Sequence, residues 1–254
     1  LQRFAVQPWD LTEDADGASY RMERLRIPDA AIQWVHGPEG LPDAAALDLL
    51  DAAMDWLTTR PVRDAPEAGP SAARRLYVDK LRTRAEAYLA MPAGQQVDAI
   101  LASGGVDGGY RGLVDRALVH VESALARVPH GQLAVMHGDL CLSNLLYDRR
   151  TGLLRVIDPR GASSEDELWG PPTYDLAKLS HSILGMYDFV NQGLFEVVVD
   201  ADLRPTLQLD GPRRPAVARA LLDHAASLGV DGLSLRAFEA TLFLSMLPLH
   251  TDAP

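Results

Sequence analysis

The chain has 254 residues, 47% of them hydrophobic and 23% charged, which is enough for a substantial buried core and ordinary for a globular protein. Its formal charge of −11 argues against nucleic acid as a partner, because phosphate binding requires clusters of basic residues. No apolar run approaches the ~20 residues of a membrane span, and the first residues have no signal-peptide pattern. The single cysteine, Cys141, excludes an intramolecular disulfide. We therefore expect a cytoplasmic protein without a membrane or nucleic-acid partner.

The N-terminal part of the chain predicts a small β structure. Residues 3–9 and 18–27 have the pattern of two strands, and the polar stretch 10–17 predicts the loop between them. Pro28-Asp29 then predicts the start of a short helix that runs through Trp34 to His36.

Most of the chain that follows is predicted to be helical. Apolar residues recur at helical spacing from Leu41 to Val128, interrupted by a proline-containing loop at 61–70. Ser71 is the predicted cap of a helix that runs to about Leu89. The glycine-rich stretch 104–110 lacks the Gly-Lys-Ser/Thr ending of a phosphate-binding loop, so we interpret it as a connection between helices.

The C-terminal third predicts three helices and a strand pair. Thr173 is the predicted cap of a helix over residues 174–189, on which Lys178 and His181 face away from the apolar stripe. Each of these two side chains is open to interpretation as a buried ion pair, a substrate contact or part of a polar face. Residues 194–199 and 206–209 predict paired strands, and 212–228 and 233–247 predict helices.

Chemistry is concentrated in His137-Gly-Asp-Leu-Cys-Leu-Ser-Asn144 and in the run Leu153–Asp158 that follows it. A β-type run leaves Asn144, residues 148–152 have the composition of a hairpin turn, and the returning run ends at Asp158. The hairpin brings Asp139, Asn144 and Asp158 to one end of a short ribbon. Phosphoryl transfer uses this set, with one Asp orienting the attacking hydroxyl and an Asn and an Asp holding Mg²⁺.

The pattern His-Gly-Asp-x-x-x-x-Asn followed by Ile-Asp resembles the catalytic and metal loops of the aminoglycoside phosphotransferase and choline kinase group. These are small-molecule kinases with a protein-kinase-like fold. The resemblance implies that Asp139 is the catalytic base, that His137 shapes the loop, and that Asn144 and Asp158 are the Mg²⁺ ligands. It also implies that Asp175, in Tyr174-Asp-Leu-Ala-Lys178, braces the catalytic loop from the start of a buried helix.

The fold implied by the resemblance is α+β, with a mostly helical large lobe at 28–254 and a remnant of the small, nucleotide-clamping lobe at 1–27. Within this scheme Met22, Glu23 and Leu25 belong to the hinge that faces adenine, and Ser143 lies with Asn144 at the bound ATP. The glycine-rich strand pair and the phosphate-gripping Lys of a complete small lobe have no counterpart here. The small lobe is therefore expected to be truncated, which puts the activity of the chain in doubt.

Asp158-Pro-Arg160-Gly resembles a subgroup associated with surface-polysaccharide and sugar-nucleotide pathways. The resemblance implies a sugar or sugar-like polyol as the hydroxyl acceptor, with an aminoglycoside or choline as the alternative. Arg160 has two interpretations. Its guanidinium, placed beside the metal site, is suited to binding an anionic group of the substrate or the transferred phosphate. It is equally suited to an ion pair with one of the acidic residues 165–167.

Two rival functions remain at this stage. A pseudokinase or regulatory module would bind nucleotide without turnover, which the absent lysine favours and the intact Asp139, Asn144 and Asp158 oppose. A hydrolase metal centre of His137, Asp139 and Asp158 lacks further His or Asp ligands at a suitable spacing.

Overall fold

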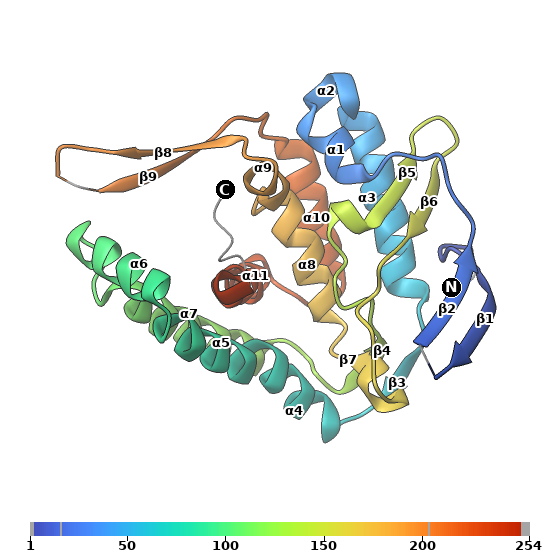
Figure 1. The fold of residues 1–254 in the computed structure, drawn as a ribbon, viewed down its shortest axis with the longest axis horizontal. Helices are drawn as coiled ribbons and strands as arrows, with labels where there is room; N and C mark the ends of the chain where they lie inside the picture. The colour runs from blue at the N-terminus through green and yellow to red at the C-terminus, as the bar shows by residue number, and fades with distance from the viewer. Residues whose placement is uncertain (1–2, 16, 203, 250–254) are drawn as a thin grey trace.

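A computed structural model describes residues 3–15, 17–202 and 204–249 as a mixture of helices and small sheets (Figure 1). The helices are α1 (Ala30–Val35), α2 (Gly37–Gly40), α3 (Asp43–Thr59), α4 (Ala68–Arg74), α5 (Lys80–Leu89), α6 (Pro92–Ser103), α7 (Gly109–Arg127), α8 (Thr173–Ile183), α9 (Tyr187–Asn191), α10 (Pro215–Ser227) and α11 (Gly232–Met246). The strands are β1 (Pro8–Asp14), β2 (Gly17–Met22), β3 (Val62–Asp64), β4 (Gln132–Val135), β5 (Leu145–Asp148), β6 (Leu153–Val156), β7 (Trp169–Gly170), β8 (Phe195–Val199) and β9 (Pro205–Leu209). This mixture confirms the predicted α+β class.

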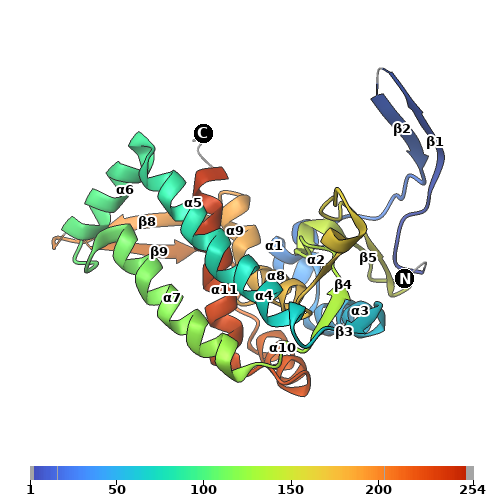
Figure 2. The ribbon, with the colours of Figure 1, turned by 90° about the horizontal axis from the view of Figure 1, so that it is seen from below.

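The hairpin of β5 and β6 is the ribbon that the motif predicts. Leu145 pairs with Val156 and Asp148 with Leu153, in antiparallel register. The N-terminal chain holds both edges of this ribbon, through isolated bridges from Ala5 to Val156 and from Asp29 to Leu146. Between these two attachment points the chain forms the β1–β2 hairpin, which projects away from the body of the molecule (Figure 2).

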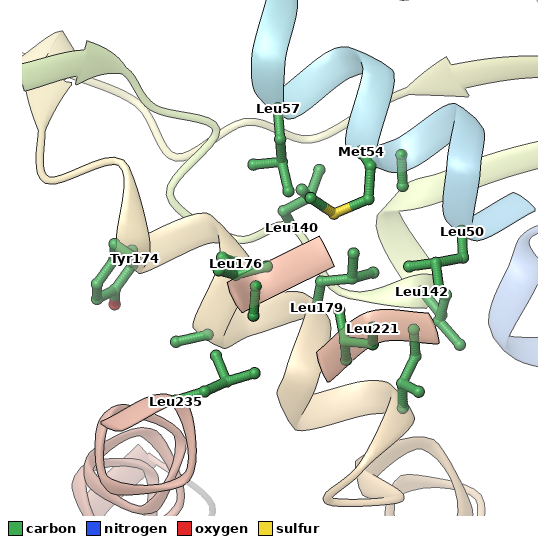
Figure 3. Packing of buried hydrophobic residues seen from close by; sticks show 14 of the residues in the cluster. Leu50, Met54, Leu57, Leu140, Leu142, Tyr174, Leu176, Leu179, Leu221 and Leu235 are labelled. Carbon is green, nitrogen blue, oxygen red and sulfur yellow. The ribbon is translucent and has the colours of Figure 1, made fainter. Parts of the chain in front are cut away.

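The core lies beneath the loop that carries the motif. Leu140 and Leu142 of this loop are fully buried among side chains of α3, α8, α10 and α11 (Figure 3). Their partners in this cluster include Leu50, Met54, Leu57, Leu176, Leu179, Leu221 and Leu235. Each fully buried leucine contributes about 1.5–3 kcal/mol, so two such anchors fix the loop firmly to the helices.

A layer of α4, α5, α6 and α7 lies on the other side of α11 (Figure 1). Leu81 and Tyr88 of α5 pack there with Tyr110 and Val114 of α7. By length and composition the segment Gly232–Leu249, which contains α11, could cross a membrane, although Arg236 and Glu239 interrupt its apolar residues. Because α11 packs against α5, α7 and α8, we interpret it as a core helix.

Near the N-terminus the structure corrects several predicted boundaries. The stretch predicted as a loop at 10–17 is largely strand, since β1 runs to Asp14 and β2 begins at Gly17. Every residue of both strands is exposed, so no buried face marks their extent in the sequence. The predicted loop at 61–70 contains β3 and the start of α4. Ser71 therefore lies inside α4 and is not its cap, because a proline in the first turn is compatible with a helix.

The helix predicted over 174–189 is divided in two. It begins at Thr173, with Pro172 in the N-cap position, so Thr173 is not the cap, and α8 ends at Ile183. Met186 has a left-handed backbone (φ 54°), which separates α8 from α9. The predicted strand pair near 194–209 and the last two helices are confirmed as β8, β9, α10 and α11, with boundaries within three residues.

Candidate functional site

Asp175 fixes the start of the catalytic loop. Its Oδ2 accepts a hydrogen bond from the backbone N–H of His137 at 2.9 Å, and its Oδ1 accepts one from Gly138 at 2.8 Å. The side chain is fully buried in an ion pair with Arg60, whose Nη2 also donates to the Pro172 carbonyl at 2.7 Å. Asp175 thus ties the loop to α8 and to the end of α3, which is the contact expected of a bracing residue.

His137 is buried within the loop and uses both ring nitrogens internally. Its Nδ1 accepts from the Asp139 backbone N–H at 3.3 Å, so the other nitrogen, Nε2, carries the proton and donates to the Ile157 carbonyl at 2.9 Å. Burial lowers the pKa of His137, which keeps the ring neutral. The ring therefore connects the loop to the end of β6 and has no nitrogen left for a metal or a substrate.

The side chains of Asp139 and Asn144 are joined at the open end of the β5–β6 ribbon, and Asp158 follows β6 at the same end. Asn144 Nδ2 donates to the Asp139 backbone carbonyl at 2.8 Å and to Asp139 Oδ2 at 3.1 Å. The Ile157 N–H donates to the Asn144 carbonyl at 3.0 Å, which extends the ribbon and places Asp158 beside Asn144. The backbone of Asp158 is left-handed (φ 54°), a strained conformation typical of functional positions.

This donor set fits Mg²⁺. The Asn144 amide nitrogen is committed to Asp139, so its Oδ1 is the atom available as a ligand. The Asp158 carboxylate forms no hydrogen bond or ion pair with any of the residues that the structure describes. Carboxylate and amide oxygens are hard ligands of the kind that Mg²⁺ prefers. Within the described ranges no group of three or more His, Cys, Asp or Glu side chains is arranged to hold a metal, so the hydrolase interpretation gains no support.

Lys178, for which the sequence left several interpretations open, contacts the catalytic loop. Its Nζ lies 2.7 Å from Asp139 Oδ1, and the lysine is largely buried on α8. Burial disfavours the charge, but the Asp139 carboxylate and its hydrogen bond outweigh burial and raise the pKa of Lys178. Its position one helical turn beyond Tyr174-Asp175 was the available signal, because residues three and four apart share a helix face.

The other lysine of the chain, Lys80, also reaches this region. Its Nζ donates to the Tyr174 hydroxyl at 2.5 Å, from the first residue of α5. Burial, together with repulsion from Arg84, Lys178 and Arg160, lowers the pKa of Lys80 to about 7. Both lysines of the sequence therefore lie around the catalytic loop.

Two cavities adjoin the loop. One, of about 520 Å³, is lined by Asp139, Ser143, Asp158 and Lys178, and also by His181, which stacks on Tyr187. The second, of about 590 Å³, lies against α4 and α5, and the two cavities share Arg84, Gly138, Arg160 and Gly161. The thiol of Cys141 borders the first cavity, where burial raises its pKa and keeps it protonated.

Arg160 stands between the two cavities. Its backbone N–H donates to the His137 carbonyl at 2.7 Å. A Cβ at Gly138 (φ 80°) would lie 2.7 Å from the Arg160 Cβ, so the absence of a side chain at Gly138 makes room for the arginine. Among the residues that the structure describes, Arg160 has no acidic partner, because Asp166 pairs with Arg63 and Glu167 accepts from the Ser163 backbone.

The predicted hinge residues lie apart from this cluster. Met22 ends the projecting β1–β2 hairpin and is 47% exposed, and Glu23 is also exposed. None of Met22, Glu23 and Leu25 lines either cavity. Residues 1–2 of the predicted small-lobe remnant and residues 250–254 of the predicted large lobe lie outside the described residues.

A loop carboxylate paired with a lysine, and an amide and a second carboxylate beside it, form the constellation of an enzyme that transfers phosphoryl groups. Residues 5–193 match the sequence profile of the Phosphotransferase enzyme family, known as APH. The chain belongs to this family, whose members are phosphotransferases related to aminoglycoside phosphotransferases and choline kinases, with a protein-kinase-like fold. The resemblance found in the sequence is thereby confirmed. No curated protein matches the chain.

Proposed function

We propose that the chain is a small-molecule kinase that transfers the γ-phosphate of ATP to a hydroxyl of a sugar or sugar-like polyol. The observation that carries this proposal is the contact of Asp139 with both Lys178 and Asn144, near Asp158, whose carboxylate has no partner among the described residues. Family membership makes the chain a phosphotransferase, and this contact set indicates how its residues divide the work.

In this mechanism Asp139 orients the acceptor hydroxyl and accepts its proton. Asn144 donates to one carboxylate oxygen and Lys178 to the other, so the Asp139 side chain is held in a single orientation. Lys178 also offers a positive charge at the point where the transferred phosphoryl group would gain negative charge. Asn144 and Asp158 would hold Mg²⁺, which screens the charge of the nucleotide phosphates when it is bound.

The alternative acceptor choline receives little support from the aromatic residues. Recognition of a quaternary ammonium requires exposed aromatic faces. Trp169, which borders the second cavity, already carries the Arg63 guanidinium 4.5 Å from its ring centroid. Tyr187, which lines the Asp139 cavity, stacks on His181, so Trp169 and Tyr187 each have one ring face already occupied.

The test is Mg²⁺-dependent binding of ATP, measured by calorimetry on the wild type and on Asp158→Ala, followed by ADP release with a panel of polyols. We expect binding that requires Mg²⁺ and is lost in Asp158→Ala, with Asp223→Ala on the exposed face of α10 as the unaffected control. Asp139→Asn should bind nucleotide but lower turnover by about 10²–10⁴-fold. Binding by Asp158→Ala equal to the wild type would refute the metal assignment. Nucleotide binding without turnover of any alcohol would favour the pseudokinase interpretation.

A further inference from the structure

The second cavity carries an unusual concentration of positive charge. Lys80 and Arg84, one turn apart on α5, line it together with Arg75 and Arg160. None of these four side chains forms an ion pair with a carboxylate of the described residues. Arg84 instead donates to the Ser245 carbonyl at 3.1 Å, and Lys80 donates to the Tyr174 hydroxyl. Unpaired cations are unexpected in a chain with 35 acidic and 24 basic residues.

Three acidic residues border this cavity, and none of them forms an ion pair with the four cations within the part of the chain that the structure describes. Asp166 is 90% exposed and pairs with Arg63 at 3.4 Å, and Glu167 accepts from the Ser163 backbone at 2.8 Å. Asp79 is exposed at the rim. Burial, with a further contribution from the neighbouring Arg84, Lys178 and Arg160, lowers the pKa of Lys80 to about 7.

The second cavity joins the Asp139 cavity, and the expected Mg²⁺ ligands are not part of its lining. The lining of the second cavity comes from α4, the π-helical turn Arg75–Asp79, α5 and the segments around Gly138 and Trp169. It contains no residue of the β5–β6 ribbon and neither of the expected Mg²⁺ ligands, Asn144 and Asp158. It meets the Asp139 cavity at Gly138 and Arg160. A molecule in the second cavity can therefore extend to Asp139 past Gly138 and Arg160.

We propose that this cavity binds an anionic group of the acceptor, a phosphate monoester or a carboxylate, through Lys80, Arg84 and Arg160. The inference rests on the proposed kinase function and names the class of its substrate, a polyol that already carries negative charge. The acceptor hydroxyl at Asp139 forms a new O–P bond, the bond from the γ-phosphorus to the β,γ-bridging oxygen breaks, and the hydroxyl proton passes to Asp139. Leu76, Met136 and Trp169 offer an apolar wall for the carbon skeleton. Cationic acceptors such as aminoglycosides are disfavoured by the same charges.

The presence of only two lysines makes a direct test feasible. Labelling the full chain with [¹³Cε]lysine gives two NMR signals, and Lys80→Arg identifies the signal of Lys80. Inorganic phosphate, titrated without nucleotide, should raise the pKa of Lys80 by about 1–3 units, because an adjacent opposite charge favours the charged form. Arg84→Gln/Arg160→Gln should weaken phosphate binding by at least about 10-fold. Arg82→Gln, an exposed residue of α5 outside both cavities, is the matched control.

The phosphates of ATP are the alternative ligand of these cations, and a competition experiment distinguishes ATP from the acceptor. If phosphate still raises the pKa of Lys80 in the presence of Mg²⁺ and a saturating, non-hydrolysable ATP analogue, a separate acceptor site is supported. Phosphate displaced by the analogue would overturn the proposal and assign the cations to ATP. An unresponsive Lys80 signal, or equal weakening by Arg82→Gln, would also overturn it. Because the titration needs no catalysis, its failure is distinguishable from a failure of Mg²⁺-dependent ATP binding.

A matched acceptor panel then identifies the anion. Sorbitol, sorbitol 6-phosphate, gluconate and glucamine share a polyol chain and differ in charge. In calorimetry with the ATP analogue and Mg²⁺, one of the two anions should bind at least about 10-fold more tightly than sorbitol, and glucamine should bind most weakly. The preferred anion distinguishes phosphate from carboxylate recognition. Tightest binding of sorbitol or glucamine would refute the proposal.

Discussion

Replacement of Asp175 by alanine should cost more stability than any exposed ion pair in the protein. The change leaves the Arg60 guanidinium, whose side chain is 1% exposed, without its carboxylate. It also removes the acceptor of the His137 and Gly138 N–H groups, at 2.9 and 2.8 Å. An orphaned buried charge costs about 3–5 kcal/mol, and each unpaired buried N–H about 1–3 kcal/mol. We expect a loss of at least about 4 kcal/mol, a large fraction of the 5–15 kcal/mol typical of a whole domain.

The assay is urea unfolding followed by tryptophan fluorescence, which is suitable because Trp56 packs on both His137 and Arg60. Arg60→Leu/Asp175→Asn should lose less than the sum of its two single variants, since it removes the charge of both partners. Asp166→Ala, which breaks the exposed pair with Arg63, is the control and should change stability by less than about 1 kcal/mol. A loss below about 1 kcal/mol in Asp175→Ala would refute the assignment of Asp175 as the brace of the loop.

Three further predictions concern the site and the core. Lys178→Met should lower kcat for ADP release by about 10²-fold with a smaller change in the Kd for ATP, because the lysine lies where the transferred phosphoryl group gains negative charge. An unchanged kcat would exclude this role. Burial raises the pKa of Glu239 to about 7, above its unfolded value, so the folded state binds the extra proton and stability falls as pH rises from about 5 to about 7. Urea unfolding should show that Glu239→Gln gains about 3 kcal/mol relative to the wild type between pH 5 and pH 8, and a pH-independent difference would contradict the assignment. Gly138→Ala should displace Arg160 and lower stability by about 1–2 kcal/mol in thermal unfolding, because the backbone of Gly138 is left-handed and the new Cβ would collide with the Arg160 side chain. Gly131→Ala, which adds a Cβ into open space, is the control. Equal effects of the two changes would disprove the argument.

The catalytic ribbon was predictable because its signals are local. Turn residues at 148–152 and apolar runs on both sides define a hairpin whose register follows from the loop length. The three polar residues of the motif meet for the same reason, since they flank strands that must pair. The β1–β2 hairpin was harder to delimit because its residues are exposed and no buried face constrains their pattern.

The cations of the site could not be placed from the sequence. Lys80 and Arg84 lie on α5, more than 50 residues before Asp139, and tertiary packing of α5, including its contact with α11, brings them to the loop. Helical periodicity fixes which face of a helix is apolar, but it does not identify the neighbour of the opposite face. The partner of Asp175 illustrates the same limit, because Arg60 follows α3 at a distance of 115 residues in the chain.

The β1–β2 hairpin lies between the two points at which the N-terminal chain is attached to the β5–β6 ribbon. Ala5 holds one edge at Val156, two residues before Asp158, and Asp29 holds the other edge at Leu146, two residues after Asn144. A displacement of the hairpin is therefore transmitted to both strands of the ribbon, next to the two expected metal ligands. A molecule that binds this exposed hairpin would therefore act on the expected metal ligands through the backbone bridges at Val156 and Leu146.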